Sequence, residues 1–146
     1  MKNEPFVIER TYEASASVIW KALTDEHEMK KWYFDLPGFR AEPGYEFTFT
    51  AGPKDGPKYT HLCKITEVIP GKKIAYTWRY EGYTGDSLVT FELFSEGNKT
   101  RVKLTHAGLE TFPADKDPGL AKKNFEQGWT SFLDVQLKKY LEKVLA

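Results

Sequence analysis

One feature constrains the fold of this chain more than any other: a long central region in which apolar and polar residues alternate. The alternation occurs in five successive segments, residues 45–51, 59–68, 74–80, 88–94 and 100–106. Short stretches rich in glycine, proline or asparagine separate these segments. A period of two is typical of β-strands buried on one face, and short connections join antiparallel neighbours. We therefore predict an antiparallel meander over residues 45–106.

The residues before the meander predict one more strand and two short helices. Residues 6–12 alternate like a strand. Ser15 is a candidate N-cap for a helix whose apolar stripe is Val18, Ile19, Ala22 and Leu23. Asp25 and Glu28 resemble a capping box, which predicts a second short helix ending near Trp32.

A single amphipathic helix is predicted after the meander. Residues 111–117 have the composition of a loop, and Asp117-Pro118 suits an N-cap followed by the first helical position. From there the helix is expected to reach the C-terminus, a length of roughly 40 Å. Its buried stripe would consist of Phe125, Trp129, Phe132, Leu133, Gln136, Leu137, Tyr140, Leu141 and Val144. Gly128 lies inside this helix, and we attribute it to a close approach to the sheet in preference to space for a ligand.

Length and charge bound the classes of function. A chain of 146 residues suits one domain with a real core, here residues 1–146. Its 21 basic and 21 acidic residues give zero net charge, which argues against nucleic acid or an anionic membrane as the main partner. No apolar run is long enough to span a membrane, and residues 1–5 lack the apolar stretch of a signal peptide. The single cysteine, Cys63, excludes an internal disulfide, so we expect a cytoplasmic protein, as a monomer or homodimer.

The predicted order of elements is the helix-grip arrangement, and particular residues resemble a known family. Residues 12–25, which read YEASASVIWKALTD, are similar to the opening motif of the START-like (SRPBCC) superfamily. They resemble most the branch related to the C-terminal domain of the activator of the ATPase of the ninety-kilodalton heat-shock protein. Further similar segments are Trp32, Pro43-Gly44, 65–74, Thr77-Trp78, 89–93, 100–106 and Gly128-Trp129.

The resemblance spans residues 6–145 and implies a fold. That fold is α+β, with a curved antiparallel sheet of six or seven strands wrapped around a long C-terminal helix, and two short helices after the first strand. Two departures concern function. Ser15-Ala16-Ser17 stands where a proline commonly follows the alanine of the family motif. The 146 residues of this sequence also contain no counterpart of the co-chaperone's N-terminal domain. The fold therefore transfers better than chaperone activation does.

A cavity or a packed core is expected between the concave face of the sheet and the helix. Its candidate lining residues are Phe47, Phe49, Tyr59, His61, Tyr76, Trp78, Val89, Phe91, Val102, Leu104, His106, Trp129, Phe132 and Gln136. Aromatic residues also fill ordinary cores, so each has a purely structural alternative. An apolar site needs a few polar groups, which Tyr59, His61, Tyr76 and Gln136 would supply. The loops at 111–117 and Pro37-Gly38 would flank the entrance.

No catalytic or metal-binding constellation is predicted. His61, Cys63 and His106 are a conceivable zinc set, but no second cysteine or helical histidine pair supports it. No Gly-x-Ser-x-Gly motif or phosphate-binding loop occurs, and Cys63 is expected to be a buried, inert thiol. The carboxylates of Glu46, Glu67 and Glu92 are expected on outward faces, away from the cavity. We therefore predict no metal and no cofactor.

Three functional hypotheses follow. The first is a non-catalytic domain that binds a small hydrophobic or amphipathic molecule by burying it. The second, implied by the resemblance, is a protein-interaction domain linked to a heat-shock chaperone and to stress, with contacts on the exposed sheet face or on residues 34–39. The third is an enzyme similar to cyclases or hydrolases of aromatic or lipid-like substrates, with Tyr59, His61, Tyr76 or His106 as acid or base. It ranks last because nothing in the sequence assembles a catalytic pair.

Overall fold

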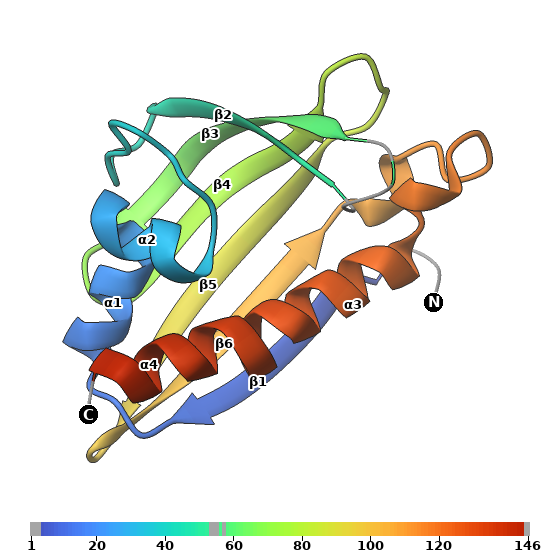
Figure 1. Cartoon of the computed structure of the whole chain (residues 1–146). Coiled ribbons are helices and arrows are strands. Elements are labelled where there is room, and N and C mark those ends of the chain that lie inside the picture. The colour runs from blue at the N-terminus through green and yellow to red at the C-terminus, as the bar shows by residue number, and fades with distance from the viewer. Residues whose placement is uncertain (1–3, 53–55, 57, 145–146) are drawn as a thin grey trace.

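A six-stranded antiparallel sheet forms the body of the protein in a computed structural model, which describes residues 4–52, 56 and 58–144 (Figure 1). The strands are β1 (Phe6–Tyr12), β2 (Glu46–Ala51), β3 (Tyr59–Ile69), β4 (Lys73–Tyr80), β5 (Ser87–Glu96) and β6 (Lys99–Ala107). Their order in the sheet is β1-β6-β5-β4-β3-β2. The predicted meander is thereby confirmed, and β1 extends it by pairing with β6.

Two short helices follow β1, as predicted. They are α1 (Ala16–Thr24) and α2 (Glu26–Trp32). The Ser15 hydroxyl accepts a hydrogen bond from the Val18 amide, and the Asp25 carboxylate accepts from the amide of Glu28. The reciprocal half of the capping box does not form, because the Glu28 carboxylate instead accepts from the Tyr140 hydroxyl. Glu28 therefore links α2 to the C-terminal helix.

The C-terminal helix begins later than the sequence predicts. Asp117-Pro118 starts only a short 3₁₀ turn, η2 (Pro118–Leu120), and Ala121 then adopts an extended conformation. The reason is tertiary: the turn carries Leu120 into the core, where 1% of its surface remains exposed. The long helix then runs as α3 (Lys122–Ser131), η3 (Phe132–Leu137) and α4 (Lys138–Val144), and it lies across the concave face of the sheet (Figure 1).

The middle part of this helix, η3, is π-helical. Along the whole C-terminal helix, buried residues follow one another at intervals of four, as Phe125, Trp129, Leu133 and Leu137. In an α-helix each such step turns the face by about 40°, because the repeat is 3.6 residues. A wider π turn corrects this drift and keeps the stripe on the sheet. The buried hydroxyl of Tyr12 in β1 donates to the Leu133 carbonyl at 2.7 Å and so supports the altered backbone.

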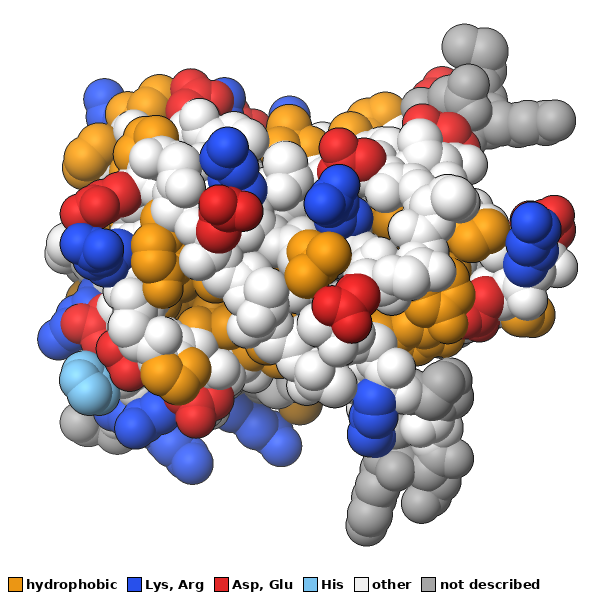
Figure 2. All heavy atoms as spheres, turned by 90° about the horizontal axis from the view of Figure 1, so that it is seen from above, with side chains coloured by type: hydrophobic (Ala, Val, Ile, Leu, Met, Phe, Trp, Pro, Cys, Tyr) orange, Lys and Arg blue, Asp and Glu red, His pale blue; other side chains and the backbone are white. Residues whose placement is uncertain are grey.

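Figure 2 shows acidic, basic and apolar side chains interspersed over the face seen from above, in keeping with zero net charge. No helix in the described part of the chain is long and apolar enough to cross a membrane. The carboxylate of Glu67 pairs with Lys73 on the outside of the sheet.

Candidate binding cavity

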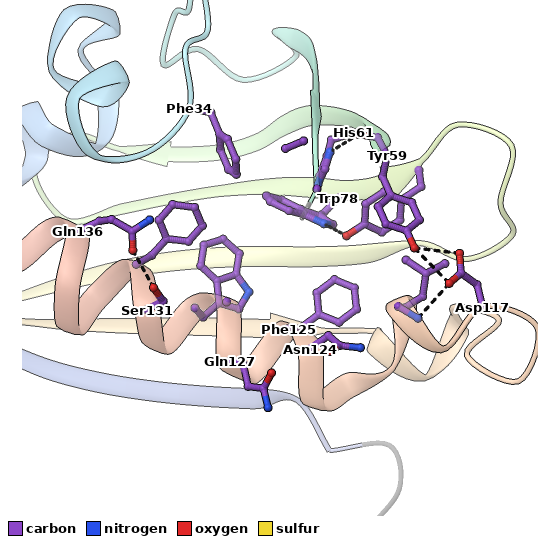
Figure 3. Close-up of a pocket in the computed structure, with 18 residues that line it drawn as sticks. Phe34, Tyr59, His61, Trp78, Asp117, Asn124, Phe125, Gln127, Ser131 and Gln136 are labelled. Carbon is purple, nitrogen blue, oxygen red and sulfur yellow. Dashed lines mark hydrogen bonds between the residues drawn. The ribbon is translucent and has the colours of Figure 1, made fainter. Parts of the chain in front are cut away.

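A cavity of about 850 Å³ lies between the sheet and the C-terminal helix (Figure 3). β2, β3 and β4 form one wall, and η2, α3 and η3 form the other. The lining residues are Phe34, Ala51, Gly52, Tyr59, His61, Trp78, Tyr80, Asp117, Gly119, Leu120, Asn124, Phe125, Gln127, Gly128, Trp129, Ser131, Phe132 and Gln136. The curvature of the sheet separates its far strands from the helix, which creates the space.

Eight of the 18 lining residues carry aromatic rings. Phe34 lies over Phe49 with 4.2 Å between ring centroids, and its edge meets Phe132 at 5.3 Å. The rings of Trp78 and Trp129 pack against each other across the sheet–helix boundary, with 5.4 Å between centroids and a tilt of 59°. Such rings offer large apolar surfaces that stack well on a planar ligand.

A hydrogen-bonded cluster closes one end of the cavity. The Tyr59 hydroxyl donates to the Asp117 carboxylate at 3.0 Å, and the same carboxylate accepts from the Gly119 amide at 3.0 Å. Asp117 therefore fixes η2 and the end of β3 together. Burial and the neighbouring carboxylate raise the pKa of Tyr59 to about 12, so this hydroxyl stays protonated at neutral pH.

Gly119→Ala is expected to open this end of the cavity. A Cβ at position 119 would lie 2.5 Å from the Tyr59 hydroxyl and 3.1 Å from the Asp117 carboxylate. The methyl group must therefore separate the two, at a cost of about 1.5–3 kcal/mol for a lost hydrogen bond to a charged group. Urea unfolding of both proteins measures this loss. An alanine variant as stable as wild type would show that the Tyr59–Asp117 contact contributes nothing.

The tryptophan walls are held by a buried histidine. Because the Trp129 indole can only donate, the 2.9 Å contact from its Nε1 makes Nδ1 of His106 an acceptor. Nε2 of His106 then carries the proton and donates to the Ser87 hydroxyl at 2.8 Å, and that hydroxyl donates to the Trp78 carbonyl. His106 is fully buried, and burial lowers its pKa to about 3. It is a neutral positioning residue behind the cavity wall.

The helix side of the cavity offers polar groups and open space. The Ser131 hydroxyl donates to the amide oxygen of Gln136 at 2.9 Å (Figure 3). A Cβ placed on Gly128 would meet no atom within 4 Å. The predicted close approach to the sheet at Gly128 is therefore wrong. This glycine borders the cavity and leaves it wider.

The structure brings together about half of the residues predicted for the cavity. Those that line it are Tyr59, His61, Trp78, Trp129, Phe132 and Gln136. Those that lie outside the lining are Phe47, Phe49, Tyr76, Val89, Phe91, Val102, Leu104 and His106. Phe91 and Leu104 belong to the closed core under the helix. Tyr76 lies on the same buried face of β4 as Trp78, but its hydroxyl contacts that of Tyr33 at 2.7 Å. Phe49 is covered by Phe34 and His61.

Several lining residues had no signal in the sequence. Phe34 follows α2 in an irregular segment, where periodicity says nothing. Asn124 and Gln127 lie off the apolar stripe of the helix and reach the cavity because its helix side is open. Of the two loops expected at the entrance, only Asp117 contributes, and Pro37-Gly38 does not line the cavity. Tyr80 was detectable, since it continues the alternation of Tyr76 and Trp78.

The described residues hold no group of three or more potential metal ligands among histidine, cysteine, aspartate and glutamate. Cys63 is buried, and burial raises the pKa of its thiol far above the ordinary value, as expected for an inert cysteine. The Ser87–His106 pair does not resemble a nucleophile and its base. The hydroxyl of Ser87 is already committed as a donor to a backbone carbonyl.

Together, a curved antiparallel sheet, a long C-terminal helix and an aromatic cavity between them define a helix-grip protein of the START-like class. Residues 13–142 match the family model described as "Activator of Hsp90 ATPase homolog 1-like protein". The chain belongs to this family, which confirms the resemblance seen in the sequence.

Solved structures of similar proteins share the fold. The Mll3558 protein of Rhizobium loti is 25% identical, with a TM-score of 0.79 over 94% of this chain and 96% of its own. CalU16 from Micromonospora echinospora is 23% identical, with a TM-score of 0.68 over 93% of this chain and 74% of its own. DynU16, from the dynemicin biosynthetic locus, is 18% identical, with a TM-score of 0.75 over 96% of this chain and 48% of its own. No curated protein matches the sequence.

Proposed function

We propose that this protein is a non-catalytic binding domain that holds a small hydrophobic or amphipathic molecule between its sheet and its C-terminal helix. The observation that carries the proposal is the cavity of about 850 Å³ with aromatic walls. Cavities that hold small ligands in proteins usually have volumes of about 300–1,000 Å³, with apolar walls and a few polar groups. This cavity has both the size and the composition.

Burial of apolar surface would provide the binding energy. Each 100 Å² of ligand surface removed from water contributes roughly 2.5 kcal/mol before the costs of association. The wall is largely set in advance, because His106 and Ser87 fix the two tryptophans. A prearranged wall favours affinity because little order is lost on binding.

The titratable side chains that line the cavity are consistent with binding without catalysis. His61 is the imidazole that lines the cavity, and burial lowers its pKa to about 4, so it is a weak base at neutral pH. The carboxylate of Asp117 is engaged by Tyr59 and Gly119. General acid–base catalysis usually relies on an acid and a base whose pKa values lie near the working pH.

A second candidate is a contact with a heat-shock chaperone, and the family match favours it. In that case the protein would change the ATP turnover of its cognate chaperone. Turnover measured with the domain at high micromolar concentration tests this candidate. An unchanged rate would eliminate it.

Native mass spectrometry of the protein purified from its own host tests the binding function. We expect a small-molecule adduct that disappears on denaturation, because burial alone holds the ligand. The variant Gly128→Leu, whose side chain would fill the cavity, should carry no adduct. An equal adduct on both proteins would place the molecule outside the cavity and contradict the proposal.

A further inference from the structure

The hydroxyl group of Tyr80 has an unused hydrogen-bond donor inside the cavity. Its hydroxyl oxygen accepts from Nε1 of Trp78 at 2.8 Å (Figure 3 draws this bond at Trp78). Since an indole nitrogen only donates, the hydrogen of the Tyr80 hydroxyl is not used in this contact. Within residues 4–52, 56 and 58–144 it has no acceptor, although only 6% of the Tyr80 surface is exposed. A buried donor without an acceptor costs stability unless a ligand or water satisfies it.

The Nε2 atom of His61 is an unused hydrogen-bond acceptor beside this donor. Its Nδ1 lies 3.0 Å from the Tyr59 carbonyl oxygen, which can only accept, so Nδ1 carries the proton. The buried ring is neutral at pH 7, and Nε2 therefore has a free lone pair. No donor in the described part of the chain reaches Nε2, and the side chain is 6% exposed.

The two groups are neighbours in the cavity wall. His61 and Tyr80 are direct partners across β3 and β4, and their ring centroids are 4.8 Å apart. Both residues line the cavity, among rings that include Trp78 and Phe34. A hydroxyl group matches this pair, because its oxygen can accept from Tyr80 while its hydrogen is donated to His61.

We propose that the ligand is a planar aromatic molecule with a hydroxyl group, in chemical terms a phenol, whose hydroxyl binds between Tyr80 and His61. This inference rests on the proposed binding function and specifies its ligand class. The ring of the ligand would stack among Trp78, Trp129 and Phe132. An anionic ligand fits poorly, since the described residues that line the cavity include no cationic side chain and an unpaired buried charge is costly.

Two probes of similar shape test the inference on the wild-type protein. Calorimetric titration compares 2-naphthol with 2-methylnaphthalene, in which a methyl group replaces the hydroxyl. A purely apolar cavity would prefer the methyl compound, because burying an unpaired hydroxyl is unfavourable. We expect the opposite order, with 2-naphthol binding about tenfold more tightly through its two hydrogen bonds.

Variants assign that preference to the two residues. Tyr80→Phe and His61→Phe should each reduce the affinity for 2-naphthol about five- to tenfold and leave that for 2-methylnaphthalene nearly unchanged. Tyr45→Phe is the matched control, since it removes a hydroxyl that is bonded to Gly38 outside the cavity. It should change neither affinity.

The outcomes separate the inference from the function on which it rests. If the methyl compound binds at least as tightly as 2-naphthol, the cavity binds apolar molecules, water satisfies the pair, and the phenol inference is overturned. If neither probe binds, the proposed function fails for aromatic ligands and the inference fails with it. Because the comparison on the wild-type protein needs no substitution, poor folding of a variant would not obscure the result.

Discussion

Replacing Gly128 with leucine is expected to abolish binding of 2-naphthol and, at the same time, to make the protein more stable. Gly128 borders the cavity, and a Cβ there meets no atom within 4 Å. We therefore expect a leucine side chain to fit without displacing its neighbours and to occupy the space that a ligand needs. The helix gains because glycine in a helix interior is about 1 kcal/mol less favourable than alanine or leucine. Calorimetric titration measures binding, and urea unfolding measures stability.

Gly128→Ala is the control for this prediction. Alanine brings the same gain in helix propensity but leaves the cavity open, so stability should rise by about 1 kcal/mol while the affinity stays near that of wild type. A leucine variant that binds as tightly as the alanine variant would place the ligand elsewhere. A leucine variant less stable than wild type would show that the space beside Gly128 is not free.

Lowering the pH from 7 to 4.5 is expected to destabilise the fold by about 5 kcal/mol through His61 and His106. Burial lowers the folded-state pKa of these residues from 6.5 to about 4 and about 3. Between these values and 6.5 the unfolded chain binds more protons than the folded protein. Stability therefore falls as the pH drops below 6.5, and the loss levels off only near the folded-state pKa values. Urea unfolding at a series of pH values measures the slope.

His61→Phe isolates half of this pH dependence. Phenylalanine can keep the stacking contact with Phe49, 4.3 Å between ring centroids, but cannot titrate. The variant should lose about half of the slope between pH 6.5 and 4.5, whatever its stability at pH 7. Comparison with wild type cancels the contributions of carboxylates. An unchanged slope would mean that His61 binds its proton as readily in the folded protein as in the unfolded one.

NMR of the ring nitrogens checks the same two histidines directly. The hydrogen bonds require opposite tautomers, with the proton on Nδ1 of His61 and on Nε2 of His106. Nitrogen shifts of the neutral rings distinguish these forms. The same tautomer at both residues would contradict the hydrogen-bond assignment of the cavity.

The fold was largely predictable because local and tertiary signals agree. Alternation over residues 45–106 identified five strands, and the N-caps at Ser15 and Asp25 placed two helices. The start of the last helix was misplaced because Asp117-Pro118 suits either an α-helix or a 3₁₀ turn. The choice depends on Leu120, whose burial against distant residues has no local signal.

The cavity was less predictable than the fold, for a physical reason. Alternation shows which face of a strand is buried, but not whether side chains or empty space lie against it. Phe91 and Trp78 share this pattern, yet one lies in the closed core and the other lines the cavity. The difference depends on how far the sheet curves from the helix. Gly128 carried the relevant signal, because a helix gives up stability by retaining glycine at a place where nothing crowds it.

The π-helical segment gives the first strand influence over a cavity that it does not line. Tyr12 in β1 bonds to the carbonyl of Leu133, and Arg10 pairs with Asp134 at 2.6 Å, so both anchors of η3 come from the opposite end of the chain. Phe132 and Gln136, which face the cavity, lie in this same segment. Substitutions at Tyr12 or Arg10 would therefore act as second-site modifiers. They would alter the width of the cavity while leaving every lining residue unchanged.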